Sequence, residues 1–305
     1  MFPIIPANSA QGVSPTQKAI FGYGNTGSYV SMTNLVSSSG VVATDTTGVG
    51  TSRGFFAASG YGGDKAIFGY GNPTTSLTNL VSNSGVVAAD VTGVGTARNG
   101  LAAASYGGNK AIFGYGDSGS FVSLTNLVSN TGVVATDTTG VGTARKHLAA
   151  ASYGGDKAIF GYGSIIGTSL LSLTNLVSNS GVVSTDTTGV GTARDALAAT
   201  SYGTDKAIFG YGRTDGDTQA VGSMTNLVSN VGVVSANTTG VGTARRYLAA
   251  ASYGGDKAIF GYGYAGSSYL SLTNLVSNTG VVATDVTGVG TARLALAAAG
   301  YSTSA

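Results

Sequence analysis

Short runs of apolar and small residues, separated by polar turns, recur along the chain and predict β-strands. One unit contains residues 101–106 (LAAASY), 110–116 (KAIFGYG), 125–129 (TNLVS) and 133–138 (VVATDT). Apolar and small side chains alternate within the second run, and Gly-containing segments such as GGNK and NTG separate the runs. This pattern is typical of strands and hairpins, and no run has the period of a helix. The unit therefore predicts four short antiparallel strands.

The unit is repeated along the whole chain. The run KAIFGYG returns without change in six places, starting at residues 18, 65, 110, 157, 206 and 257. A fixed internal period predicts a repeat architecture. Both faces of the strands carry apolar or small residues, as expected when each sheet packs between two neighbours. A β-propeller provides two neighbours for every sheet, whereas a solenoid needs polar caps and separate domains of about 45 residues could not build their own cores.

The two ends of the chain carry complementary parts of one unit. The first repeat begins at its second strand, at Lys18, and the chain ends with a lone first strand in residues 294–301. We therefore predict an all-β fold, a single six-bladed β-propeller in residues 18–305, with four-stranded antiparallel blades and about 24 strands. The C-terminal strand is expected to complete the first blade and close the ring. Residues 1–17, with three prolines, are expected to form an irregular lead-in.

Composition narrows the classes of partner. Only 9% of the 305 residues are charged and the formal net charge is +2, so the chain lacks the basic field typical of nucleic-acid binders. It has no Cys, which excludes disulfides and thiolate metal sites. The N-terminus lacks the features of a signal peptide, and no run approaches the ~18 apolar residues of a membrane helix. We expect neither nucleic-acid binding nor membrane insertion.

Length variation between the repeats is confined to one loop. Successive KAIFGYG motifs are 47, 45, 47, 49 and 51 residues apart, and the loops between GYG and TNLV in those units hold 8, 6, 8, 10 and 12 residues. Once the loop is subtracted, 39 residues remain in each unit. The repeats therefore diverge in length only between the second and third predicted strands.

A second variable position is the pair of residues after each TAR or TSR motif. In an up-and-down blade this pair and the variable loop emerge on the same face, whereas the YGGDK and SNTG turns of the opposite face are nearly uniform. Loops on a rigid frame commonly carry recognition, and Tyr is a frequent contact residue. We expect ligand or partner binding at Tyr29, Phe55, Phe121, Lys146, His147, Arg213, Asp215, Asp217, Arg246, Tyr247, Tyr264 and Tyr269. Drift in unconstrained loops, and docking through the uniform face, are the alternative interpretations.

Catalytic chemistry has few candidate residues. The chain has no Glu, and its single His, His147, cannot form a multi-His metal site and is interpreted as an ordinary exposed side chain. Glycoside hydrolysis usually needs paired carboxylates with separate roles. Five aspartates instead occupy one repeated position: Asp45, Asp90, Asp137, Asp186 and Asp285, with Asn237 in the remaining unit. We interpret them as structural residues that bond N–H groups of the DTTG link.

Three further motifs have structural interpretations. The arginine of each TAR or TSR motif is expected to bond carbonyls or an Asp at the blade junction. These residues are Arg53, Arg98, Arg145, Arg194, Arg245 and Arg293. GVGTAR has the glycines of a phosphate loop but no following helix, so nucleotide binding is rejected. Asp215 and Asp217 lack the spacing of a calcium loop. We therefore predict no catalytic residues, no metal and no cofactor.

The order of the motifs carries a family resemblance. Arg, two or three residues, LAAASYGG and then KAIFGYG together resemble the kelch repeat over about half of each unit. The stretch SLTNLVSNTGVVATDTTGVGTAR resembles the propeller repeats of bacteriophage structural proteins, particularly marine ones. This second resemblance implies a virion location, on a tail, a fibre or the capsid surface. It also implies a partner that is another virion protein or a host-surface receptor or glycan.

The sequence therefore predicts a non-enzymatic phage virion component that binds through variable loops on one face of a rigid propeller. A carbohydrate-binding propeller lectin of cellular origin is the alternative, and repeated equivalent pockets between blades would favour it. A hydrolase is opposed by the missing Glu and the single His. A designed consensus propeller is opposed by the irregular loop lengths.

Overall fold

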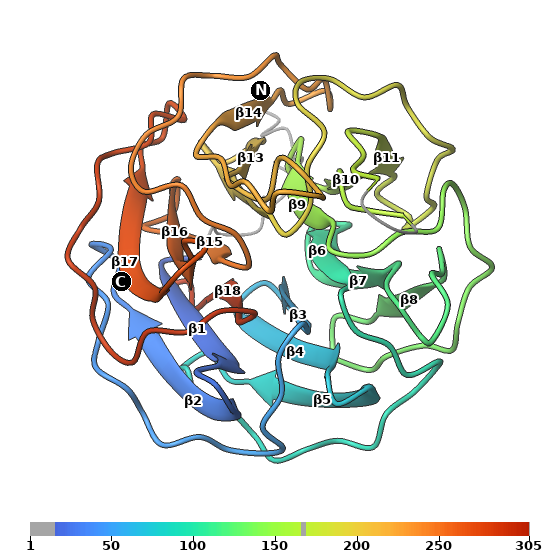
Figure 1. Ribbon diagram of the computed structural model, residues 1–305. Coiled ribbons are helices and arrows are strands. Elements are labelled where there is room, and N and C mark those ends of the chain that lie inside the picture. The colour runs from blue at the N-terminus through green and yellow to red at the C-terminus, as the bar shows by residue number, and fades with distance from the viewer. Residues whose placement is uncertain (1–15, 166–168, 305) are drawn as a thin grey trace, which may run out of the picture.

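The six units form six three-stranded antiparallel sheets in a propeller-like arrangement (Figure 1). The computed structural model describes residues 16–165 and 169–304. Over these residues the protein contains strands and no helix, and accordingly no helix in this part of the chain is long and apolar enough to cross a bilayer. The prediction of an all-β fold with six antiparallel sheets is confirmed.

We call the sheets blades 1 to 6 and describe each from its inner to its outer strand. Blade 1 consists of β18 (Ala297–Tyr301), β1 (Lys18–Asn25) and β2 (Tyr29–Val36); blade 2 of β3 (Ala57–Tyr61), β4 (Lys65–Gly71) and β5 (Thr75–Val81). Blade 3 consists of β6 (Ala102–Tyr106), β7 (Lys110–Gly114) and β8 (Thr125–Val128); blade 4 of β9 (Ala149–Tyr153), β10 (Lys157–Gly161) and β11 (Thr174–Val177). Blade 5 consists of β12 (Ala198–Tyr202), β13 (Lys206–Gly210) and β14 (Thr225–Val228); blade 6 of β15 (Ala249–Tyr253), β16 (Lys257–Tyr264) and β17 (Tyr269–Val276).

The inner strands surround the centre of the ring (Figure 1). Each contacts the inner strands of both neighbouring blades, and β18 contacts β3 and β15 in this way. β18 also pairs with β1, so blade 1 contains strands from the two ends of the described chain. The backbone N–H of Gln17 donates to the carbonyl of Ser302 at 2.7 Å and extends this pairing. Except for Thr16 and Gln17, the predicted lead-in of residues 1–17 lies outside the described residues.

Each middle strand is buried on both of its faces between neighbouring blades. In β10, Phe160 packs with Ile112 and Tyr115 of blade 3, whereas Ile159 packs toward blade 5. All four side chains are fully buried, as expected for a strand whose alternate residues meet two apolar surfaces. The packing leaves no room for a side chain at Gly114, because a Cβ there would lie 2.7 Å from Cζ of Phe160.

The predicted fourth strand does not form, so the expectation of four-stranded blades is wrong. In blade 3, residues 133–138 meet β8 only in two isolated bridges, Val128↔Val134 and Thr125↔Thr138. Between these bridges the outer segment has one residue more than β8, which interrupts the ladder as a β-bulge does. The described residues form 18 strands, where about 24 were expected.

A buried asparagine accounts for the interruption. The Nδ2 atom of Asn126 donates to the carbonyl of Ala135 at 3.0 Å and to Oδ1 of Asp137 at 2.9 Å. The Asn126 side chain therefore adds hydrogen bonds between the two bridges, where a regular ladder would use backbone groups alone. The same two bonds recur in every blade. Together with backbone bonds such as the Ala135 N–H to the Leu127 carbonyl at 2.8 Å, these side-chain bonds hold the outer segment without a regular strand ladder.

Candidate binding face

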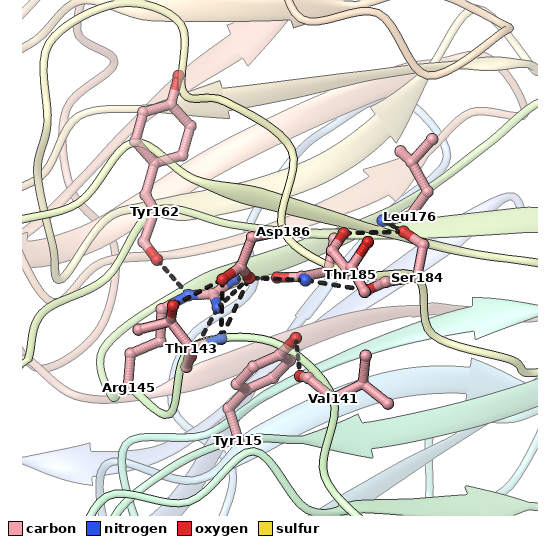
Figure 2. A network of polar contacts seen from close by, with 10 residues as sticks. Tyr115, Val141, Thr143, Arg145, Tyr162, Leu176, Ser184, Thr185 and Asp186 are labelled. Carbon is pink, nitrogen blue, oxygen red and sulfur yellow. Dashed lines mark hydrogen bonds and ion pairs between the residues drawn. The ribbon is translucent and has the colours of Figure 1, made fainter.

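The most regular polar cluster lies at the junction between neighbouring blades, and Figure 2 shows it for blades 3 and 4. Arg145 is fully buried. Its Nη2 donates to Oδ1 of Asn175 at 2.7 Å, its Nη1 to the carbonyl of Thr143 at 3.0 Å, and its Nε to the carbonyl of Tyr162 at 2.8 Å. The guanidinium lies 4.3 Å from the ring centroid of Tyr115, in a cation–π contact. Each of the three guanidinium nitrogens of Arg145 therefore donates a hydrogen bond, whereas Nε of the equivalent Arg53 and Arg194 has no partner among the described residues.

The repeated aspartate completes the junction. Asp186 accepts from the backbone N–H of Thr143 at 3.0 Å, from its hydroxyl at 2.6 Å, and from Nδ2 of Asn175 at 2.9 Å. Burial acts to raise the pKa of Asp186, but these hydrogen bonds and the charge of Arg145 outweigh burial and lower it. The carboxylate bonds the GVGT link of the preceding unit. The expected bonding to N–H groups of its own DTTG link is therefore corrected.

The two variable positions of every blade are joined by a backbone bridge. The first residue of the pair after TAR or TSR pairs with the first residue of the variable loop. In blades 1 to 6 these bridges are Leu294↔Asn25, Gly54↔Asn72, Asn99↔Asp117, Lys146↔Ser164, Asp195↔Arg213 and Arg246↔Tyr264. The loops and pairs therefore meet at one end of the blades, which we call the variable face.

The second residues of the pairs form a closed ring of backbone hydrogen bonds. Each N–H donates to the carbonyl of the equivalent residue in the preceding blade, at 2.7–2.9 Å. All six have φ between +52° and +62°, a region that L-residues other than Gly rarely adopt. The members of this axial ring are Phe55, Gly100, His147, Ala196, Tyr247 and Ala295. The ring joins all six blades at the variable face.

Large and small side chains alternate around the axial ring. The aromatic rings of Phe55, His147 and Tyr247 come from blades 2, 4 and 6, and their centroids lie 5.2–5.7 Å apart. Gly or Ala occupies the three intervening positions. His147 is only 15% exposed and its Nδ1 lies 3.6 Å from Oδ2 of Asp195. The expectation that His147 is an ordinary exposed side chain is therefore wrong. The small residues Gly100 and Ala196 on either side of it leave room for its ring to pack against Phe55 and Tyr247.

Charged residues of the variable face are paired across blades 3 to 5. Nζ of Lys146 lies 2.9 Å from Oδ2 of Asp117 and 5.0 Å from the ring centroid of Phe121. Asp195 accepts from Nε and Nη2 of Arg213 at 2.8 and 2.6 Å. Burial acts to raise the pKa of Asp195, but the nearby imidazole of His147 and the hydrogen bonds from Arg213 lower it. Asp195 was not among the predicted site residues. The sequence signal that could have identified it is its opposite charge to Arg213: Asp195 is first in the variable pair and Arg213 is first in the variable loop of the same unit.

The longest loop, in blade 5, brings two arginines to one glutamine. Nη1 of Arg213 donates to Oε1 of Gln219 at 3.2 Å, and Nη1 of Arg246 donates to the same oxygen. The guanidinium of Arg246 lies 5.5 Å from the ring centroids of Tyr247 and Tyr264. Sequence reasoning missed Gln219, because nothing in an unrepeated loop marks a glutamine as the acceptor of two arginines.

The carboxylate of Asp215, near the tip of this loop, bonds to the loop itself. Oδ1 of Asp215 accepts from the N–H of Asp217 at 2.8 Å and of Thr218 at 3.3 Å, and Oδ2 accepts from the Thr218 hydroxyl at 2.8 Å. These bonds are typical of an Asx turn. Among the described residues no cluster of three or more His or Asp side chains could hold a metal ion.

The remaining predicted contact residues lie on blades 1 and 6. Nδ2 of Asn72 in blade 2 donates to the hydroxyl oxygen of Tyr29, and a Cβ at Gly54 would lie 3.0 Å from the Tyr29 ring. The rings of Tyr264 and Tyr269 lie 5.7 Å apart, with Tyr269 37% exposed. The structure therefore distributes the predicted residues around the whole face and does not gather them in one pocket.

The opposite end of the ring is hollowed and lined by small residues. A cavity of about 200 Å³ lies among the inner strands. The hydroxyls of Ser105 and Ser152 are 3.1 Å apart on its wall, and those of Thr16 and Ser252 are 3.2 Å apart. Gly300 replaces the serine of blades 3 to 6 here, and a Cβ at this position would lie 2.4 Å from Oγ1 of Thr16.

Comparison with known proteins adds no family to this description. No protein-family model matches the chain, and no curated protein matches it. The resemblance to kelch and phage propeller repeats therefore stays a prediction from the repeat motifs.

Proposed function

We propose that this protein is a non-enzymatic recognition module, a phage virion component whose propeller-like ring presents the variable face to a host-surface molecule or to another virion protein. The observation that carries the proposal is the bridge in every blade between the variable loop and the variable pair. Because of these bridges, the loops that vary in length and most of the unrepeated charged and aromatic residues lie together at one end of the repeated blades. Loops on rigid scaffolds commonly carry binding.

The placement of the side chains supports binding over chemistry. Arg213, Arg246 and Lys146 interact with neighbouring aromatic or acidic side chains and are partly exposed. Aromatic and arginine side chains are the residues that most often dominate interfaces. His147, the only histidine of the chain, is packed in the axial ring. The virion setting is supported by the resemblance of the repeats.

The test is binding of the labelled, purified protein to candidate bacterial host cells and to purified virion proteins. The comparison is a variant in which every longer loop is replaced by the six-residue loop of blade 2, residues 72–77. A matched control changes the same number of residues in the YGGDK and SNTG turns of the opposite face. We expect the parent and the control to bind and the short-loop variant to lose binding while it keeps its circular dichroism spectrum. Binding that is lost only in the control would transfer the function to the opposite face.

A further inference from the structure

Two guanidinium groups converge on one uncharged oxygen at the boundary of blades 5 and 6. Oε1 of Gln219 accepts from Nη1 of Arg213 at 3.2 Å and from Nη1 of Arg246. Guanidinium groups bond most strongly to carboxylate or phosphate oxygens, because the hydrogen bond is then assisted by opposite charge. An amide oxygen supplies the hydrogen-bond acceptor without the counter-charge. The position of this oxygen is therefore favourable for an anion.

The charge of one of the two arginines is not balanced. Arg213 is bound by both oxygens of Asp195, and Lys146 of the same face is bound by Asp117. Arg246 has no carboxylate within 4.0 Å among the described residues. Its Nε is buried and has no hydrogen-bond partner in that part of the chain. Arg246 is only partly exposed, and a partly buried cation is better stabilised with a counter-charge than without one. An anion that reaches its Nη atoms supplies the counter-charge that the protein does not.

Gln219 is placed so that a ligand could displace it. Its side chain is exposed and its φ is +62°, a strained value for a residue other than Gly. Its Nε2 donates to the carbonyl of Gly216 within the same loop at 2.6 Å. Of the two acidic residues of the loop, Asp215 is engaged by Thr218 and the loop backbone, and neither Asp215 nor Asp217 has a carboxylate oxygen within 4.0 Å of a guanidinium nitrogen of Arg213 or Arg246. Moving the Gln219 amide therefore frees both guanidinium groups without breaking a contact to another blade's carboxylate.

Aromatic rings lie beside the unbalanced arginine. Tyr247 and Tyr264 flank its guanidinium at 5.5 Å, and Tyr269, which is 37% exposed, continues the surface from Tyr264. A flat ring with a polar hydroxyl can cover the apolar C–H face of a sugar and bond its hydroxyl groups. The arrangement of a cation beside exposed tyrosine fits a pyranose that carries a carboxylate.

We propose that Arg246 and Arg213 bind the carboxylate of an acidic sugar, a uronic acid unit of a surface glycan, whose ring lies against Tyr264 and Tyr269. The carboxylate takes the place of the Gln219 oxygen. This proposal rests on the proposed function and names the ligand class for one sector of the variable face. Asp195 holds Arg213 in position and neutralises its charge, so the net positive charge that selects the ligand belongs to Arg246.

The test uses the purified full chain and uronic acid oligosaccharides, with the neutral oligosaccharide of the same linkage and acetate as comparison ligands. Gln219→Glu places a carboxylate of the same shape against both arginines, so we expect it to weaken uronate binding by about tenfold or more while the midpoint of unfolding rises. Arg246→Gln is expected to weaken uronate binding by a similar factor. Lys110→Gln, which removes an exposed cation at the start of β7, on the opposite face, is expected to leave binding unchanged.

Calorimetric titration distinguishes the outcomes. No uronate binding by the parent chain, or equal binding by the parent, Gln219→Glu and Arg246→Gln chains, overturns the site. Acetate bound as tightly as the uronate, or the neutral sugar bound equally well, rejects the acidic sugar as the ligand. Parent binding to cells or virion proteins that is lost on loop shortening but unchanged in Arg246→Gln also rejects this site, while the recognition function of the face survives.

Discussion

The blade junctions and the variable face both contain arginines, but these arginines are held in different ways. At the junctions the guanidinium is fully buried and donates to the same asparagine position in all six blades. At the variable face Arg213 and Arg246 share Gln219, a residue of one loop only. Removing a partner from a buried charge is costly, whereas a partly exposed charge can be solvated by water when a partner changes. The junction therefore tolerates little change, and the face can diverge.

Replacing a junction arginine should have the largest effect on stability. Arg145→Met removes a buried cation and leaves Asn175 and Asp186 without their shared partner, so we expect a loss of about 3–5 kcal/mol in the free energy of unfolding. Lys146→Met, one residue along the chain, removes only a partly exposed ion pair and should cost less than about 1 kcal/mol. Urea denaturation of both variants measures the difference. Similar losses in the two variants would contradict the division between junction and face.

Closing the space between neighbouring blades should have a smaller effect. Gly114→Ala introduces a Cβ that would lie 2.7 Å from Cζ of Phe160, and such overpacking costs about 1–3 kcal/mol. Because the clash involves one ring, adding Phe160→Leu should recover part of the loss, and the two changes should be non-additive. Denaturant midpoints of the two single variants and the double variant check this coupling. Additive losses would show that Gly114 is needed for another reason.

Acid should weaken the five junctions that contain an aspartate, but not the junction that contains Asn237, because an asparagine does not titrate. Hydrogen bonds outweigh burial and lower the pKa of the junction aspartates, including Asp137 and Asp186. Their stabilising contribution is therefore complete above the unfolded-state pKa of about 3.9 and is lost as the pH falls through the folded-state pKa. In blade 5 the same position is Asn237, whose Oδ1 accepts from the Thr192 N–H at 3.2 Å and whose Nδ2 donates to the Thr192 hydroxyl at 2.7 Å.

The natural asparagine supplies matched variants for this pH dependence. Asp137→Asn should make the fall in stability between pH 5 and 3 shallower, and Asn237→Asp should make it steeper, since each changes one titrating group at an equivalent position. Urea unfolding across that pH range gives both slopes. If the slopes of the two variants equal that of the parent, the acid sensitivity arises outside the junctions.

The arrangement of the strands could be predicted from the sequence because the same pattern of strand-forming segments occurs six times. KAIFGYG identified the middle strands, and the partial units at the two ends indicated the pairing that β18 and β1 make. The fourth strand could not be excluded in the same way. VVATDT has the composition of a strand, and only the bonds of Asn126 to Ala135 and Asp137 show that a side chain interrupts the ladder.

The variable face was predicted as a location and not as a set of contacts. Strand order placed the loops and the pairs on one face, and the bridges put them in contact. The axial ring could not be predicted, because Phe55, His147 and Tyr247 belong to alternate blades and meet only when the ring is complete. The shared oxygen of Gln219 likewise depends on the conformation of a loop that occurs once.

A change at the exposed edge of the variable face should have the smallest effect on stability. Tyr269 is 37% exposed and contacts Tyr264 through its ring, so Tyr269→Ser should change the free energy of unfolding by no more than about 0.5 kcal/mol. The same substitution removes the aromatic surface next to Arg246, so it should weaken uronate or cell binding although the fold is unchanged. Thermal unfolding and binding of one preparation measure both properties. If the Tyr269→Ser chain binds normally but unfolds at a lower temperature, this residue supports the fold and not binding. The division between stabilising junctions and a variable face that can diverge would then not extend to blade 6.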